Sequence, residues 1–172
     1  CIRDRHSPGI ETTTGSLAQA LSQAGGIALA RKRRGDTGNV WVMMSDGEFQ
    51  EGQIWEAIGE AAKYGLDNLR VVVDVNGQQC DGCIVPDHYV DPLAPRIEAF
   101  GGSVSVVDGH DLEALDQAMA LETGKPHFVL AMTNPARGLE LFEERAPLFH
   151  YLRFSSDEER ARYEQAYEDM VS

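Results

Sequence analysis

The chain has 172 residues, of which 42% are hydrophobic, and a formal net charge of −13 at pH 7. This length and apolar content suit one folded domain and exclude a disordered chain, while the negative charge argues against nucleic acid as a partner, because its phosphates would be repelled. No apolar run approaches the ~20 residues needed to cross a bilayer, and residues 1–30 lack a secretion signal, so a cytoplasmic protein with no membrane partner is expected.

The chain starts with Cys1 in place of Met, within a polar stretch, so we expect it to begin inside a domain. Apolar residues spaced by three and four positions then predict a helix over residues 15–33. Gly25 and Gly26 lower the helix propensity at its centre, and we expect them to allow close packing. The basic run Arg31–Arg34 resembles a nucleic-acid patch, but its place at the end of a helix favours a role in balancing the helix dipole.

Further along the chain, short apolar runs alternate with helical patterns. Strands are predicted over residues 40–44, 69–73, 104–107 and 127–132, the first two buried on both faces. Helices are predicted over residues 53–64, 92–100 and 111–122, with Leu112, Leu115 and Met119 of the last one facing inward. Residues 133–150 are expected to form a long loop, and a capping box at Ser156 opens a final helix.

This alternation predicts an α/β fold in which a parallel sheet is flanked by helices on both faces, truncated at its N-terminus. Residues 1–172 would form a single domain, to which residues 134–172 contribute the loop and the C-terminal helix. The CxxC pair Cys80 and Cys83 has no second pair to complete a zinc site, and a packing role is favoured over a reactive dithiol.

Two loops that follow predicted strands carry candidate metal ligands. Asp46 and Asn76 each offer an oxygen, and the 30 positions between them leave room for one helix joining adjacent strands. Magnesium prefers hard oxygen ligands from carboxylates, amides, carbonyl groups and phosphates. Gly47 and Gly77 would let the backbone approach an anion, although two ordinary loop turns of this composition are the alternative.

The residues around these loops resemble the transketolase family. The stretch 46–57, DGEFQEGQIWEA, is similar to the thiamine diphosphate motif of that family, and the similarity continues through residues 66–69 and 74–82. The stretches 8–17, 98–102 and 108–111 are also similar, so the resemblance covers residues 8 to about 134 clearly.

The resemblance implies a role for each matching residue. Asp46 and Asn76 would bind Mg²⁺ together with the Gln78 backbone carbonyl, and Gly47 would lie against the diphosphate. Gly15 and Leu17 would line the thiamine pocket. Glu51 is implied as the catalytic acidic residue that meets a glutamate of the partner domain, and His150 as a residue that touches the diphosphate, with a buried structural histidine as its alternative.

Several positions depart from the family pattern, among them Cys80 and Cys83, which stand where the family often has apolar or small residues. Ser45 replaces a glycine, which should tighten the conformational demands on the turn before Asp46. Ala18 and Ala20 also stand where the family has glycines, so helix packing near the cofactor should differ.

The resemblance implies a thiamine diphosphate- and Mg²⁺-dependent transferase that moves a two-carbon ketol unit from a ketose to an aldose. The glutamate that contacts the pyrimidine has no candidate in this sequence, so the resemblance implies a pyrimidine-binding partner subunit in an α2β2 dimer of heterodimers, acting on sugars or sugar phosphates. A deoxyxylulose phosphate synthase, a pyruvate dehydrogenase component and a non-catalytic subunit of the same fold are the alternatives.

Overall fold

The protein is described by a computed structural model that covers residues 9–79, 82–84, 90–151 and 153–172. Its centre is a four-stranded sheet with the strand order β1-β2-β6-β5, in which every neighbouring pair is parallel. These strands are β1 (Val40–Ser45), β2 (Leu69–Val75), β5 (Ser103–Asp108) and β6 (His127–Met132). The α/β fold with a parallel sheet is therefore confirmed.

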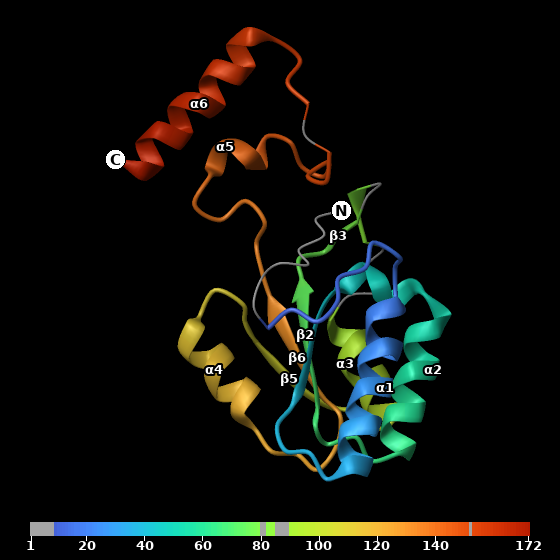
Figure 1. Ribbon diagram of the computed structural model, residues 1–172. Helices are drawn as coiled ribbons and strands as arrows, with labels where there is room; N and C mark the ends of the chain where they lie inside the picture. The colour runs from blue at the N-terminus through green and yellow to red at the C-terminus, as the bar shows by residue number, and fades with distance from the viewer. Residues whose placement is uncertain (1–8, 80–81, 85–89, 152) are drawn as a thin grey trace.

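Helices cover both faces of the sheet, as Figure 1 shows. On one face lie α1 (Gln19–Arg34), α2 (Gly52–Lys63) and α3 (Val90–Ala99), and on the other lies α4 (Leu112–Ala120). The connections from β1 to β2 and from β2 to β5 step across the sheet in one direction, whereas the step from β5 back to β6 reverses it. Because crossovers between parallel strands are right-handed, this reversal puts α4 on the opposite face.

The main core lies between the sheet and the three helices α1, α2 and α3. Ile54 and Ile58 of α2 are fully buried, as the helical spacing predicted, and they belong to one cluster with Val71 and Val73 of β2 and Phe128 of β6. The central strands β2 and β6 are buried along almost their entire length, which explains the apolar runs 71–73 and 128–132 at their centres.

The prediction that the first strand is buried on both faces is wrong. Val42 and Met44 of β1 point into the core, but Trp41 is 50% exposed and Met43 is 76% exposed. β1 is an edge strand, and α4 packs on β5 and β6 at the far side of the sheet, so one face of β1 is left uncovered within the described residues.

The first helix begins later than its sequence pattern predicts. α1 starts at Gln19, because Ala18 adopts a left-handed backbone with φ of 68°, and Leu17 stays outside the helix. Leu21, Ala24 and Ala28 are buried as expected, and the basic residues from Arg31 onward occupy the last turn. The expected close packing at Gly25 and Gly26 is wrong within the described residues. Apart from the adjacent residues and the backbone of α1 itself, no atom lies within 4 Å of where a Cβ would stand at either position.

The inward face predicted for the fourth helix is also partly wrong. Leu112 is 81% exposed, and the buried residue of α4 is Ala118. The carbonyl oxygen of Ala118 lies 3.2 Å from Nε2 of the buried His127, so the C-terminal half of α4 makes the contact with β6. Leu112 stands in the first turn of the helix, beyond that contact.

The loops at the carboxyl edge of the sheet contain short elements that the sequence did not indicate. A 3-10 helix, η1 (Asp46–Gln50), follows β1, and a two-stranded antiparallel pair, β3 (Gln78–Gln79) and β4 (Gly82–Cys83), follows β2. Cys80, one member of the CxxC pair, lies outside the described residues.

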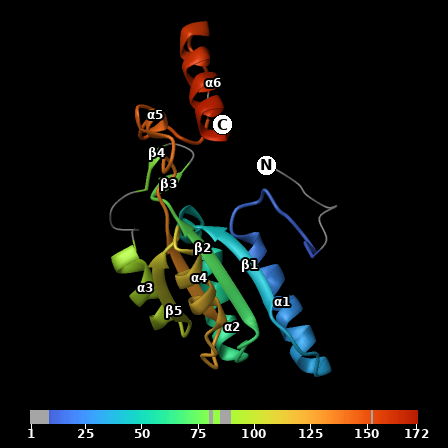
Figure 2. The ribbon, with the colours of Figure 1, turned by 90° about the vertical axis from the view of Figure 1, so that its left-hand side faces the viewer.

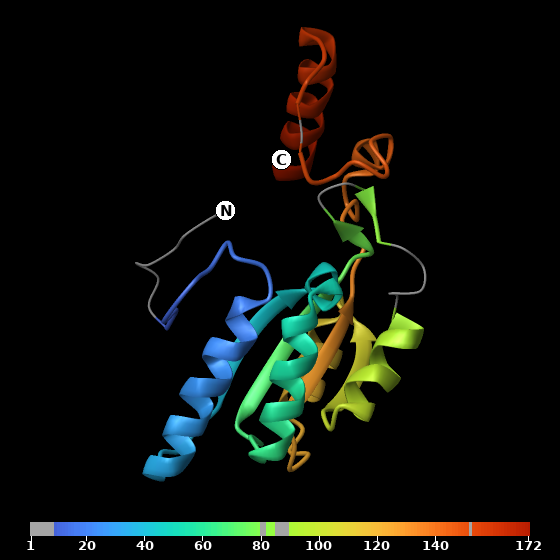
Figure 3. The same cartoon turned by 90° about the vertical axis from the view of Figure 1, so that its right-hand side faces the viewer.

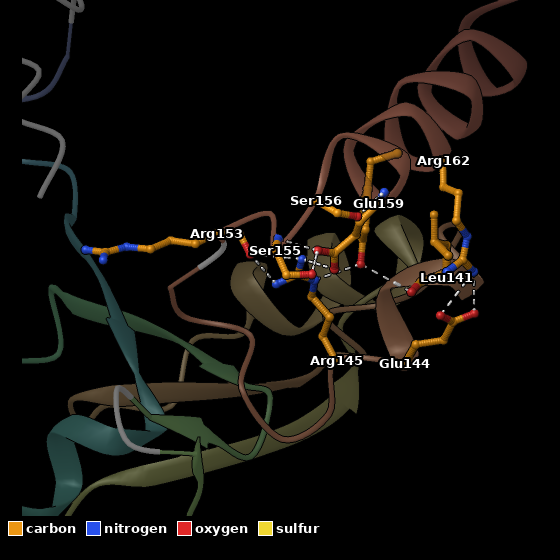
Figure 4. A network of polar contacts seen from close by, with 9 residues as sticks. Leu141, Glu144, Arg145, Arg153, Ser155, Ser156, Glu159 and Arg162 are labelled. Atoms are coloured by element: carbon orange, nitrogen blue, oxygen red, sulfur yellow. Dashed lines mark hydrogen bonds and ion pairs between the residues drawn. The ribbon is translucent and has the colours of Figure 1, made fainter.

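The C-terminal part of the chain extends away from the sheet, as Figures 2 and 3 show. The expected loop over residues 133–150 contains one short helix, α5 (Glu140–Glu143), and is followed by α6 (Asp157–Val171), which Ser156 caps. Figure 4 shows how the Arg145 side chain links the parts of this segment: it donates hydrogen bonds to the Glu159 carboxylate in α6 and to the Arg153 carbonyl before it. In the part of the chain that the structure describes, no helix is long and apolar enough to cross a membrane.

Candidate functional site

The loops after β1 and β2 meet at the carboxyl edge of the sheet. The two strands are paired in register through Ser45 and Asp74, so that Asp46 and Asn76 emerge side by side. Asp46 Oδ2 accepts a hydrogen bond of 2.7 Å from the Gly77 backbone N–H. Asp46 Oδ1 accepts another of 2.9 Å from the Gly47 backbone N–H. The first of these bonds links the two loops directly.

Asp46 is a buried carboxyl group with an unusual environment. Asp46 is only 3% exposed, and within the described residues it forms no ion pair with Lys, Arg or His. Burial raises its pKa from 3.8 to about 6, while the hydrogen bonds from Gly77 and Gly47 oppose this rise and the negative charge of Asp74 adds to it. A cation beside Asp46 would relieve this unfavourable burial of negative charge.

The turn after β2 supplies a second oxygen beside Asp46. Asn76 Oδ1 accepts a hydrogen bond of 2.8 Å from the Gln78 backbone N–H, next to the Gly77 N–H that Asp46 binds. Gly77 has a φ of 69°, which favours glycine, and this conformation turns successive N–H groups toward the two side chains. The carboxylate of one loop and the amide oxygen of the next are thus held by adjacent peptide groups.

Gly47 leaves room beside these oxygens. A Cβ built on it would meet Gln79 Cβ at 3.8 Å and the Gln78 carbonyl oxygen at 3.9 Å, which are ordinary contacts. Gly47 does not have a positive φ either. The fold of the chain therefore does not require glycine here, and the absence of a side chain leaves the backbone open to close approach by a ligand.

The start of α1 is connected to the same edge by Glu48. Glu48 Oε2 accepts a hydrogen bond of 2.8 Å from the Ala18 N–H, and Oε1 accepts one of 3.1 Å from the Ser45 N–H. Leu17, next to Ala18, is 53% exposed, and Gly15 is exposed as well. Ser45 has an extended backbone that any residue adopts, so the expected tightening of its turn does not occur.

The two remaining predicted residues lie at different places. Glu51 is exposed at the N-cap of α2, directly after η1. His150 is exposed in the segment between α5 and α6, and its ring packs edge-on against Tyr151. In the described part of the chain, no hydrogen bond or ion pair joins His150 to Asp46 or Asn76, and its exposure contradicts the alternative of a buried structural histidine.

Sequence reasoning missed two polar residues behind Asn76. Asp74 accepts a hydrogen bond of 2.9 Å from Asn76 Nδ2, and it also accepts one from the Thr133 hydroxyl. Asp74 stands two positions before Asn76 at the end of a buried strand, a position at which an acidic residue could have been noticed. Thr133 lies 59 positions from Asp74 in the chain, and only the pairing of β2 with β6 brings them together.

The donor set fits a hard cation bound together with a phosphate. Among the residues that the structure describes, no three His, Cys, Asp or Glu side chains gather into a metal cage. The available donors are instead one buried carboxylate, one amide oxygen and nearby backbone carbonyl groups. Such a partial set of oxygen ligands leaves coordination positions for phosphate oxygens and water, as Mg²⁺ sites commonly do.

Comparison with solved structures supports the same class of domain. A transketolase from Campylobacter jejuni superposes with a TM-score of 0.70 at 28% identity, over 93% of this chain and 30% of that one. The chain matches the family described as "Transketolase, thiamine diphosphate binding domain" over residues 3–139. Fold and match together define an α/β domain of the thiamine diphosphate-binding class.

The sequence relatives make the assignment specific. The transketolase family protein y4mO of Sinorhizobium fredii is 40% identical over 157 residues, which are 89% of this chain and 56% of that protein. An apulose-4-phosphate transketolase subunit from Actinobacillus succinogenes is 38% identical over 154 residues, 88% of this chain and 55% of that protein. The chain belongs to the transketolase family and spans about half the length of these curated relatives.

Proposed function

We propose that this chain is the diphosphate- and magnesium-binding part of a transketolase-type transferase, which moves a two-carbon ketol unit from a ketose to an aldose. A pyrimidine-binding partner subunit completes the enzyme in this proposal, as a dimer of heterodimers. The substrates are sugars or sugar phosphates. Membership of the transketolase family and the arrangement of oxygens at the carboxyl edge of the sheet support it.

One observation carries the proposal. Asp46 Oδ2 and Asn76 Oδ1 accept hydrogen bonds of 2.7 and 2.8 Å from the consecutive N–H groups of Gly77 and Gln78. The turn therefore holds two oxygens of the kind that Mg²⁺ prefers in fixed positions. Each oxygen has a second lone pair, so these hydrogen bonds do not prevent it from binding a metal.

The residues of the chain then take distinct roles. Asp46, Asn76 and the Gln78 carbonyl would hold Mg²⁺, while the backbone at Gly47 would lie against the diphosphate that shares this cation. Leu17, together with Gly15, would contact the thiamine part of the cofactor, and its exposed apolar side chain suits such a contact. Thiamine diphosphate, when bound, supplies the electron sink for breaking and forming the carbon–carbon bond.

The partner subunit is inferred from the position of Glu51 and from the relatives. Glu51 is exposed directly after η1, the 3-10 helix that begins with Asp46, and from there it can meet an acidic group from another subunit. A shared proton or a hydrogen bond between two carboxyl groups is a usual way to accommodate such a pair. The name of the Actinobacillus succinogenes relative describes one subunit of an enzyme, which supports a split enzyme here. His150 stays a proposed diphosphate contact. This contact requires the C-terminal segment to close toward the site.

Calorimetric titration tests the proposal. Thiamine diphosphate is titrated into the full-length protein, first by itself and then with the pyrimidine-binding subunit, in the presence and absence of MgCl₂. We expect magnesium-dependent binding that is strongest with both subunits present. Asp46→Ala should abolish it, because the variant removes the only carboxylate in the proposed donor set. Asp108→Ala is the matched control, since it removes an exposed carboxylate from the end of the edge strand β5.

The outcomes separate the alternatives. Binding that does not depend on magnesium, or that is retained in Asp46→Ala, would contradict the metal assignment. Magnesium-dependent binding without ketol transfer from any ketose would leave a cofactor-binding but non-catalytic subunit. Turnover of pyruvate in place of ketose sugars would indicate a different thiamine diphosphate enzyme.

A further inference from the structure

Asp74 has no role in the proposed donor set, yet both of its carboxylate oxygens are engaged at the site. Oδ2 accepts a hydrogen bond of 2.9 Å from Asn76 Nδ2, and Oδ1 accepts one from the Thr133 hydroxyl. Asp74 is partly buried at the end of β2, and its charge contributes to the raised pKa of Asp46. Because Asp74 places a second negative charge near Asp46, its presence at this position needs a structural explanation.

The hydrogen bonds around Asn76 permit only one orientation of its side-chain amide. A carboxylate only accepts hydrogen bonds, so the group that faces Asp74 must be the amide nitrogen. A backbone N–H only donates, so the group that faces Gln78 N at 2.8 Å must be the amide oxygen. If the amide were rotated by half a turn, its oxygen would face the Asp74 carboxylate, with two acceptors opposed. Its NH₂ group would face the Gln78 N–H, with two donors opposed.

Thr133 fixes Asp74 from a third strand. Thr133 follows β6, and its backbone N–H donates to the Val75 carbonyl at 3.1 Å, next to Asp74. Gly109 packs closely against the Thr133 methyl group, since a Cβ atom at position 109 would lie only 2.5 Å from Thr133 Cγ2. The threonine therefore has little freedom to turn its hydroxyl away from Asp74.

We infer that Asp74, held by Thr133, is a positioning residue that fixes the Asn76 amide with its oxygen toward the Gly77–Gln78 turn and so makes it available to Mg²⁺. This inference rests on the proposed function, because it assigns Asn76 to the metal. Asp74 itself does not bind the cofactor. Ligands that are oriented by outer hydrogen bonds lose about 10- to 100-fold in metal affinity when the outer partner is removed.

The test measures how much magnesium is needed for cofactor binding. Thiamine diphosphate is held at a fixed concentration with the full-length protein and its partner subunit, and MgCl₂ is titrated. Asp74→Ala should raise the magnesium concentration at half-saturation by about 10- to 100-fold. Thr133→Val should raise it by a smaller factor, because Asp74 remains but loses its hydroxyl donor. Thr133→Ser keeps that donor and should restore the wild-type value within about twofold.

Two readouts distinguish positioning from general damage to the fold. The amount of thiamine diphosphate bound at saturating magnesium should equal that of the wild type, and the melting temperature without cofactor should be the same for Thr133→Val and Thr133→Ser. Asp108→Ala removes a carboxylate from the end of β5, two strands away from β2, and Asp108 does not contact Asn76, so this variant should leave the magnesium titration unchanged.

The inference is overturned if Asp74→Ala and Thr133→Val both titrate like the wild type. It is also overturned if Thr133→Ser is as impaired as Thr133→Val, because the hydroxyl would then be irrelevant. If Asp74→Ala fails to fold, the comparison of the two Thr133 variants decides the matter. Absence of magnesium-dependent binding in the wild type would instead refute the proposed function, so the two failures are distinguishable.

Discussion

Asp46 and Gly77 lie 31 positions apart, and a hydrogen bond of 2.7 Å joins the Asp46 carboxylate to the Gly77 N–H. This bond ties the 3-10 helix after β1 to the turn after β2, across the pair of strands that carries them. It also holds a nearly inaccessible carboxyl group at a site that has no positive side chain paired with it among the described residues. Its consequences for stability and binding can be measured.

The metal-free protein should become less stable as pH rises through the range set by Asp46. Its folded-state pKa of about 6 lies above the ordinary 3.8, so the folded protein binds the extra proton between these values. The contribution of Asp46 to the free energy of unfolding is therefore fully present below about pH 4 and is lost by about pH 6–7, a change of roughly 3 kcal/mol. Urea unfolding across this range, compared with Asp46→Asn, isolates this contribution. Identical pH dependence in the two proteins would contradict it.

Gly47→Ala should separate cofactor binding from folding. The added methyl group would meet its nearest atom, Gln79 Cβ, at 3.8 Å, so the cofactor-free protein should be unchanged or up to about 1 kcal/mol more stable. A diphosphate against the backbone would be displaced, at a cost of about 1–3 kcal/mol, or about 5- to 150-fold in affinity. Gly59→Ala is a matched control, because its nearest atom also lies at 3.8 Å but in Phe100. Equal binding by both variants would remove Gly47 from the site.

Ala18→Gly should stabilise the protein, whereas Ala20→Gly should destabilise it. Ala18 has a φ of 68°, a conformation that costs a residue with a Cβ roughly 1–2 kcal/mol, while glycine loses about 0.5–1 kcal/mol of chain entropy on folding. The net gain is up to about 1.5 kcal/mol. Ala20 is the second residue of α1, where glycine costs up to about 1 kcal/mol. Thermal unfolding of both variants measures the difference, and a loss of stability in Ala18→Gly would show that its buried methyl group outweighs the backbone strain.

Arg145→Lys should loosen α6 from the rest of the chain. The Arg145 guanidinium donates to Glu159, to the Arg153 carbonyl and, at 3.0 Å, to the Tyr163 hydroxyl, and lysine cannot reproduce this planar set. A loss of about 2 kcal/mol would speed amide hydrogen exchange in residues 157–171 by about 30-fold. Arg162→Lys is the control, since Arg162 pairs with Glu144 on the surface, where such pairs contribute ~0–1 kcal/mol. Equal exchange in the two variants would contradict a special role for Arg145.

The alternation of strands and helices could be predicted because it depends on local patterns. A Val-rich stretch marked β2, a short apolar run marked β6, and the three- and four-residue spacing of Ile54, Ile58 and Ala61 marked α2. The order of the strands in the sheet could not be predicted in this way. β6 inserts between β2 and β5, and this choice leaves β1 at an edge with Trp41 and Met43 exposed.

Part of the candidate site was accessible to sequence reasoning for a related reason. Asp46 and Asn76 follow consecutive strands of a parallel sheet, whose carboxyl ends meet at one edge, so their approach follows from the chain order. The hydrogen bond from the Ala18 N–H to Glu48, by contrast, joins the start of α1 to η1 across 30 positions, and nothing in either segment alone indicates it.

The sequence by itself determined the family, the α/β class and the two residues proposed to bind magnesium, because these depend on residue types at short spacings and on the fixed polarity of parallel strands. Only the tertiary structure decided how those residues are oriented. The bond from Asp46 to Gly77 and the contacts of Asp74 with Asn76 and Thr133 join separate strands. Such contacts depend on strand order and register, which are set by the packing of the whole sheet and leave no periodic trace in any one segment.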